Sequence, residues 1–324
     1  MQPDLPKMFE RARSLARTKE TGITVSALLL FVVFAKTSDS FLTEYNLFNV
    51  SRTVGLFVLI ALSQAVALVV GCMNLSVGAI GGLATIATGY LIAEAGVPAL
   101  AAACGGLLVG VGAGAVNGWL ITRLKINSFI TTLSTLFIFT GLVFGLSRGY
   151  AYTEIPKSFT TVGRGAFLSL SNLFWIAAAT LLVMHLVFRR TVLGRHLIAT
   201  GGNREAARLS GINTDRMVLA ANVLSGFFAA FAAVLWVSRM GSAQPATGKD
   251  WLIKSFAIAI VGGTGLSGGS ISALGLLMGA IIIVLIKNGL VIVEANVYYE
   301  QAFLGAIILV AVIIDRAGEL WLKR

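Results

Sequence analysis

Residues 53–72 read TVGLFVLIALSQAVALVVGC, a stretch without a single charged side chain. A helix of about 20 apolar residues is long enough to cross the roughly 30 Å of hydrocarbon in a bilayer. The rest of the 324-residue chain has the same character, because 57% of it is hydrophobic and only 12% is charged. Soluble domains carry about 25% charged residues. A soluble enzyme, a disordered chain and a fibrous repeat are therefore disfavoured, and the sequence predicts an all-α polytopic membrane protein.

About ten segments have the length and apolarity of transmembrane or broken membrane helices. The first and the eighth are short, and the third begins so soon after the second that a re-entrant or broken helix fits it as well. The predicted segments are Thr21–Ala35, Thr53–Cys72, Leu75–Ala93, Val97–Thr122, Ser128–Ser147, Leu173–Phe188, Met217–Ser238, Leu252–Gly263, Ile271–Lys287 and Gln301–Ile314.

The basic residues predict how the chain is oriented. Most of its 25 Lys and Arg residues fall on one side of the membrane when ten spans alternate from a cytoplasmic amino terminus, as the positive-inside rule requires. Topology thus explains the net charge of +11 without a nucleic-acid partner. We expect residues 1–20 to be a cytoplasmic segment, 21–315 a single transmembrane domain and 316–324 a cytoplasmic tail.

The sequence lacks the groups that would power transport within this chain. None of its 14 Asp and Glu residues lies in the middle of a predicted span, where proton-coupled carriers keep a titratable group. It has no phosphate-binding P-loop and no motif that predicts a catalytic or metal site. If ATP supplies the energy, another subunit must therefore hydrolyse it. A sodium-coupled carrier or a channel remains the alternative, because unwound backbone can bind cations without a carboxylate.

The polar stretch 189–216 is the longest on the predicted cytoplasmic side and favours a short amphipathic helix. Asn203 is a suitable amino-terminal cap and Gly211 a suitable stop. Ala206, Leu209 and Ile212 should then share one face. Such a helix either rests on lipid headgroups or docks a soluble partner, and we favour docking.

Two glycine-rich breaks interrupt the apolar segments, at residues 71–78 and 262–269. Their motifs LSVGAIGG and LSGGSISA are similar, and each is followed by an Asn-Gly pair, at Asn117 and Asn288. Paired interrupted segments point to a substrate path at the interface between two repeats. Close helix packing through small residues is an equally good reading.

Several motifs give the chain a family resemblance from about Phe41 to the last span. It resembles the permease subunits of bacterial monosaccharide ABC importers, such as those for ribose, xylose and galactosides. The motifs that carry the resemblance are Asn46–Asn49, Asn74–Gly78, Asn117–Gly118, Phe129–Leu133, Thr191–Arg195, Gly201–Asn203, Ala206–Asn213, Ser242–Pro245 and Gly262–Thr264.

The resemblance implies a multi-pass protein of the bacterial inner membrane that imports a sugar or polyol by alternating access. It implies three partners besides lipid: a cytoplasmic ABC ATPase that binds ATP and Mg²⁺, a periplasmic sugar-binding protein, and a second permease subunit. This chain would bind no cofactor itself. Residues expected to couple to the ATPase are Gly194, Arg195, Gly202, Asn203, Arg204, Glu205, Ala206, Ala207, Arg208 and Gly211. Candidates for lining the translocation path are Asn74, Ser76, Gly78, Asn117, Phe129, Thr132, Gln244 and Thr264.

Two positions depart from the family pattern. Asn74 stands where relatives usually have Asp, and Leu252–Lys254 replaces an acidic Glu-Leu-Asp. Either the solute bears negative charge, or this subunit pairs with a different permease that keeps the acids. Both alternatives rank below a neutral solute carried through a homodimer.

Overall fold

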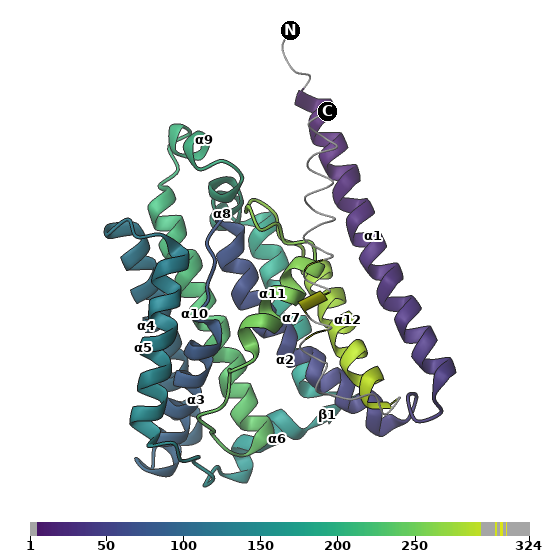
Figure 1. The fold of residues 1–324 in the computed structure, drawn as a ribbon, viewed down its shortest axis with the longest axis vertical. Coiled ribbons are helices and arrows are strands. Elements are labelled where there is room, and N and C mark those ends of the chain that lie inside the picture. The colour runs from purple at the N-terminus through teal and green to yellow at the C-terminus, as the bar shows by residue number, and fades with distance from the viewer. Residues whose placement is uncertain (1–4, 293–301, 303–304, 307–308, 310–324) are drawn as a thin grey trace.

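The computed structural model describes residues 5–292, 302, 305, 306 and 309, with side chains from residue 20 onward. Its helices run between two ends of a bundle, which we name by the elements found there, the α9 end and the α6 end (Figure 1). The elements are α1 (Leu5–Thr37), α2 (Glu44–Val69), α3 (Val77–Ala93), α4 (Ala99–Arg123), α5 (Ser128–Ser147), α6 (Lys157–Arg164), β1 (Ala166–Phe167), β2 (Leu170–Ser171), α7 (Asn172–Arg190), α8 (Val192–Gly202), α9 (Arg204–Leu209), α10 (Thr214–Met240), α11 (Trp251–Val261) and α12 (Ala273–Ile292).

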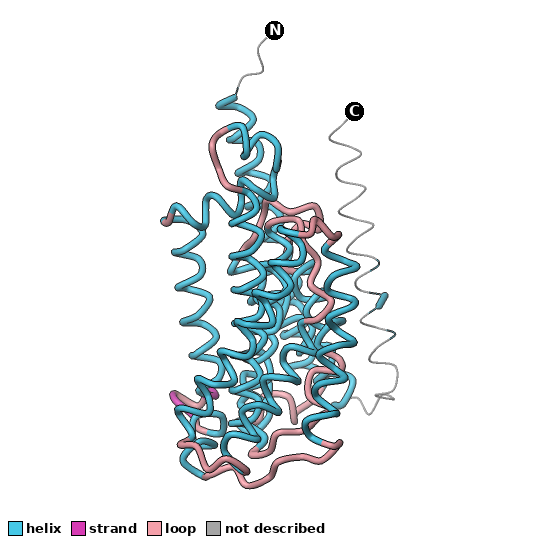
Figure 2. Tube along the Cα trace, turned by 90° about the vertical axis from the view of Figure 1, so that its left-hand side faces the viewer, coloured by secondary structure: helices cyan, strands magenta, loops and turns pink. Residues whose placement is uncertain are grey.

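The all-α membrane fold is confirmed. Within the described residues, 7 helices are long and apolar enough to cross a membrane, and two shorter apolar helices, α3 and α11, accompany them. These match the first nine predicted segments in order. The tenth, Gln301–Ile314, lies almost entirely outside the described residues. Short α6 and the antiparallel pair β1–β2 at the opposite end from α9 had not been predicted (Figures 1 and 2).

Helix α2 forms the centre of the bundle. Leu56, Leu59 and Ile60 are fully buried on it, and α10, α7, α11 and α12 all contact it. The outer helices instead expose apolar side chains, such as Leu108 on α4 and Phe137 on α5, each nearly 70% exposed. Since water would not favour such a surface, these faces suit lipid or a second subunit.

Small residues bring α4 and α10 into direct backbone contact. A Cβ added at Gly114 would lie 2.3 Å from the carbonyl oxygen of Asn222, and one at Gly110 would lie 2.5 Å from that of Gly226. Small residues at such crossings let membrane helices pack by van der Waals contact, where lipid offers no hydrophobic driving force. These contacts make α4 and α10 a single packed pair.

Candidate functional site

The stretch between α7 and α10 folds as two short helices, α8 and α9, at the end of the bundle (Figure 1). Side-chain oxygens cap both: Thr191 accepts from the Gly194 amide at 3.2 Å, and Asn203 accepts from the Ala206 amide at 3.0 Å. The chain leaves α9 through Gly211, whose φ of 83° is the left-handed conformation that glycine adopts without strain. The predicted cap and stop residues are both confirmed. Most of the predicted coupling residues, among them Arg195, Arg204 and Arg208, are exposed on α8 and α9.

The apolar residues predicted to share one face of α9 do not pack on the bundle, which leaves them open to a partner. Ala207 is buried, whereas Ala206 is exposed and Leu209 is 85% exposed. Arg204 forms an ion pair with Asp215 at the start of α10. The side of α9 that carries Arg204 and Ala207, one helical turn apart, faces the bundle.

The two glycine-rich breaks predicted from sequence meet beside α8. The Gly269 amide donates to the carbonyl of Val69, at the end of α2, over 2.9 Å. A Cβ added at Gly201 on α8 would lie 1.8 Å from that same carbonyl oxygen, and one at Gly268 would lie 2.9 Å from the Gly71 nitrogen. The coupling segment therefore touches the second break and the end of α2, just before the first break.

A buried polar network links the first break to three helices. The Asn74 side chain donates to the Ser225 hydroxyl on α10 at 2.8 Å and accepts from the Ser76 hydroxyl at 2.7 Å. The Asn117 amide on α4 donates to that Ser76 hydroxyl at 2.8 Å, and Ser63 on α2 donates to the Ser225 carbonyl at 2.8 Å. All five residues are fully buried. The structure thus brings together three of the predicted path residues, Asn74, Ser76 and Asn117, inside the subunit.

The other path candidates lie apart from this network. Thr132 on α5 is buried and donates to the carbonyl of Met73, at 3.1 Å. Thr264 is buried too, and its hydroxyl has no hydrogen-bond partner among the residues described. Phe129 and Gln244 are exposed. The path role of all eight candidates remains a prediction.

Gly78 is the path candidate that borders an open groove. The groove, about 180 Å³ in volume, lies between α3, α5 and the loop after α10. Gly78 packs so closely that a Cβ there would lie 2.1 Å from the carbonyl oxygen of Gly248. On the groove's rim, the Lys249 ammonium lies over the Phe144 ring, 5.6 Å from its centroid. The groove is thus mostly apolar, with a few polar groups such as Thr140, Thr247 and Lys249 on its wall.

Lys254 is one of the departures from the family pattern, and a neighbouring residue balances its positive charge. Its side chain, only 8% exposed, forms an ion pair with Asp250 one helical turn earlier, and its ammonium lies 5.1 Å from the centroid of the Phe57 ring. A buried charge with such partners is compensated. Lys254 also does not line the groove that Gly78 borders. The lysine therefore gives no support for a negatively charged solute.

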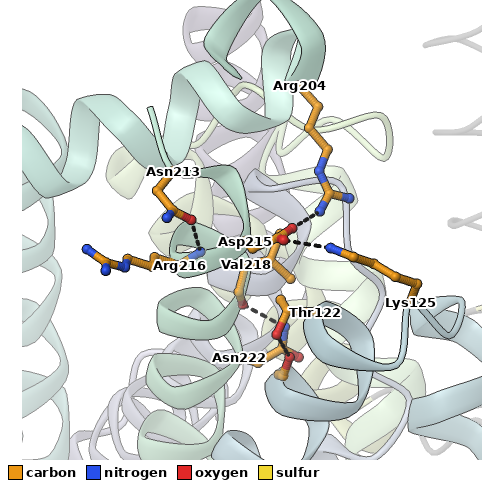
Figure 3. Close-up of polar contacts among 9 residues, drawn as sticks. Thr122, Lys125, Arg204, Asn213, Asp215, Arg216, Val218 and Asn222 are labelled. Carbon is orange, nitrogen blue, oxygen red and sulfur yellow. Dashed lines mark hydrogen bonds and ion pairs between the residues drawn. The ribbon is translucent and has the colours of Figure 1, made fainter. Parts of the chain in front are cut away.

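Sequence reasoning missed Lys125 and Asp215. Asp215 accepts from the Lys125 ammonium at 2.6 Å through one carboxylate oxygen and from Arg204 at 2.8 Å through the other (Figure 3). These residues line an open recess of about 880 Å³ below α9. An acid in the first turn of a helix, two residues after its Asn213 cap, was the available signal, but nothing in the sequence paired it with Lys125.

Asn74→Ala should destabilise the protein by about 1–3 kcal/mol, because the buried Ser76 hydroxyl loses its acceptor and the buried Ser225 hydroxyl loses a donor. The purified subunit should show this as a lower unfolding temperature in detergent. Glu154→Ala, a change at an exposed residue whose side chain makes no hydrogen bond within the described part of the chain, should shift stability by no more than about 0.5 kcal/mol. Equal unfolding temperatures for Asn74→Ala and the unsubstituted protein would contradict the network.

Comparison with known proteins places this geometry in context. Residues 46–312 match the family described as "Branched-chain amino acid transport system / permease component". The chain is 31% identical over 299 residues to the ribose import permease protein RbsC of Escherichia coli (strain K12), covering 91% of this chain and 93% of that one. It is 32% identical over 296 residues to the L-arabinose ABC transporter permease protein AraH of Azospirillum brasilense, covering 91% and 87%. It is also 31% identical over 292 residues to the D-allose transport system permease protein AlsC of Escherichia coli (strain K12), covering 90% of each.

Proposed function

Because this chain belongs to the family of branched-chain amino acid transport system permease components, we propose that it is the membrane subunit through which an ATP-driven importer moves a sugar or polyol. The chain is a transporter component, a multi-pass permease of the inner membrane, and not an enzyme. Relatives named for ribose, L-arabinose and D-allose favour a monosaccharide or a polyol of similar size.

The observation that carries this proposal is the coupling segment, α8 and α9. The segment lies at one end of the bundle (Figure 1), and its Arg195, Glu205 and Arg208 are exposed. Gly201 on α8 packs against the end of α2 and against Gly269 of the second break. A soluble ATPase docked on that charged face would have direct mechanical access to the membrane helices. The α9 end then faces the cytoplasm, as the distribution of Lys and Arg predicts.

We expect two permease subunits, two ATPase subunits that bind ATP and Mg²⁺, and a periplasmic protein that delivers the sugar. Closure of the ATPase pair would move α8 and α9, and the membrane helices would open in turn to each side. A homodimer is the simplest assembly. A neutral solute is the simplest cargo, because Asp250 already balances the charge of Lys254. The exposed apolar faces of α4 and α5 suit lipid and the second subunit.

Co-purification tests the assembly. The tagged chain should bring down its partner ABC ATPase from detergent extracts of cells that express both. Gly211→Val should weaken this association, because a β-branched residue is strained at a φ of 83° and would displace α9. An ATPase that never associates with the unsubstituted chain, in detergent or in nanodiscs, would contradict the proposal.

A further inference from the structure

Asp215 occupies the point where three segments from different parts of the sequence converge. Its two carboxylate oxygens hold Lys125, from the connection between α4 and α5, and Arg204, from α9 (Figure 3). Asp215 itself lies in the first turn of α10. One side chain thus fastens the coupling segment to both members of the packed pair α4–α10.

Lys125 holds a costly backbone conformation at this contact. Its φ is 55°, in the left-handed region that residues with a Cβ seldom adopt. The conformation directly follows the end of α4, and the ammonium reaches Asp215 from there. Unusual backbone conformations cluster where function requires a fixed geometry.

A continuous mechanical route leads from Asp215 into the membrane. Asp215 and Ser225 belong to the same helix, α10, separated by about 15 Å at 1.5 Å per residue. Ser225 accepts the hydrogen bond from Asn74 in the first break. Lys125 directly follows α4, and α4 packs on α10 through glycines. Displacement of α9 would therefore reach the break through a rigid element.

We propose that Asp215 is a positioning residue that transmits movement of the coupling segment to the α4–α10 pair, and through α10 to the break at Asn74. The proposal rests on the proposed function, since it assumes an ATPase docked on α8 and α9. It assigns Asp215 no contact with solute or ATPase. Half-exposed ion pairs contribute little to stability, so the effect is expected in coupling and not in folding.

The test uses the full assembly in proteoliposomes, with the ATPase and the binding protein, and measures solute imported per ATP hydrolysed. Asp215→Asn should keep the ATPase bound and active but lower this ratio at least about fivefold, the lower end of typical allosteric coupling factors. Asp215→Glu, which keeps the negative charge, should retain most of the solute imported per ATP in the unsubstituted assembly. Glu154→Gln is the matched control, because Glu154 is exposed and its carboxylate makes no hydrogen bond within the described part of the chain.

A double-mutant cycle separates transmission from general damage. Lys125→Met should lower the ratio, and adding it to Asp215→Asn should lower it little further, because both changes remove one contact. An unchanged ratio in Asp215→Asn would overturn the proposal, and so would loss of the ATPase from that variant, which would make Asp215 a docking residue. Absence of ATP-dependent uptake in the unsubstituted assembly would instead refute the proposed function.

Discussion

Gly114→Val is expected to destabilise the subunit by about 2 kcal/mol or more, the range measured for overpacked cores. The added Cβ would lie 2.3 Å from the carbonyl oxygen of Asn222 and 3.0 Å from its carbon. Backbone cannot yield as the end of a flexible side chain can, so α4 and α10 must separate. Thermal unfolding of the purified protein in detergent, monitored by size-exclusion chromatography, measures the loss.

The same helix provides the control. Gly112 lies two residues earlier on α4, and a Cβ there would meet nothing within 4 Å. Gly112→Val makes the same change in composition and intrinsic helix propensity, so it should leave the unfolding temperature nearly unchanged. If both valines destabilise the protein equally, helix propensity and not the α4–α10 contact accounts for the loss.

Arg208→Glu is expected to lower ATP-driven uptake at least about tenfold, equivalent to about 1.4 kcal/mol of lost interaction. Arg208 is exposed on α9 and borders the recess below that helix. Its guanidinium pairs with no acid among the described residues. Reversing its charge should repel the ATPase surface that it meets without disturbing the fold. Uptake of radiolabelled sugar by proteoliposomes that contain the full assembly measures the effect.

Lys157→Glu is the matched charge reversal at the other end of the bundle. Lys157 is the exposed first residue of α6, where an acid suits the helix dipole, so uptake should stay normal. Arg208→Lys should retain part of the uptake. If Lys157→Glu and Arg208→Glu reduce uptake alike, net charge and not docking would be the cause.

Local signals were enough to predict the helices and their order. The uncharged stretch 53–72 predicted α2, although the helix begins earlier, at Glu44. Thr43 caps it there, accepting a hydrogen bond from the Asn46 amide. Because the first turns of the helix are polar, a prediction based on apolar residues placed its start too late. Asn203 and Gly211 predicted the ends of α9 because capping depends on residues within the same few positions.

Contacts between distant residues could not be predicted. Arg204 on α9 bonds Asp215, and Asn117 on α4 bonds Ser76 in the first break, and nothing in the sequence paired these residues. Sequence similarity linked the two breaks only as a pair of motifs, whereas the structure places Gly268 directly beside Gly71. Asn288, the counterpart of Asn117, bonds Asn46 at 2.8 Å instead, so the two halves use their Asn-Gly pairs differently.

The most direct test of the account is sugar uptake by proteoliposomes that contain this chain, with and without its ATPase and ATP. Ribose, arabinose and allose are suitable first solutes, supplied with the binding protein. The account predicts uptake against a gradient only when the ATPase, ATP and Mg²⁺ are all present, and no stimulation by a sodium gradient. Concentrative uptake by this chain alone, driven by sodium and indifferent to ATP, would contradict it.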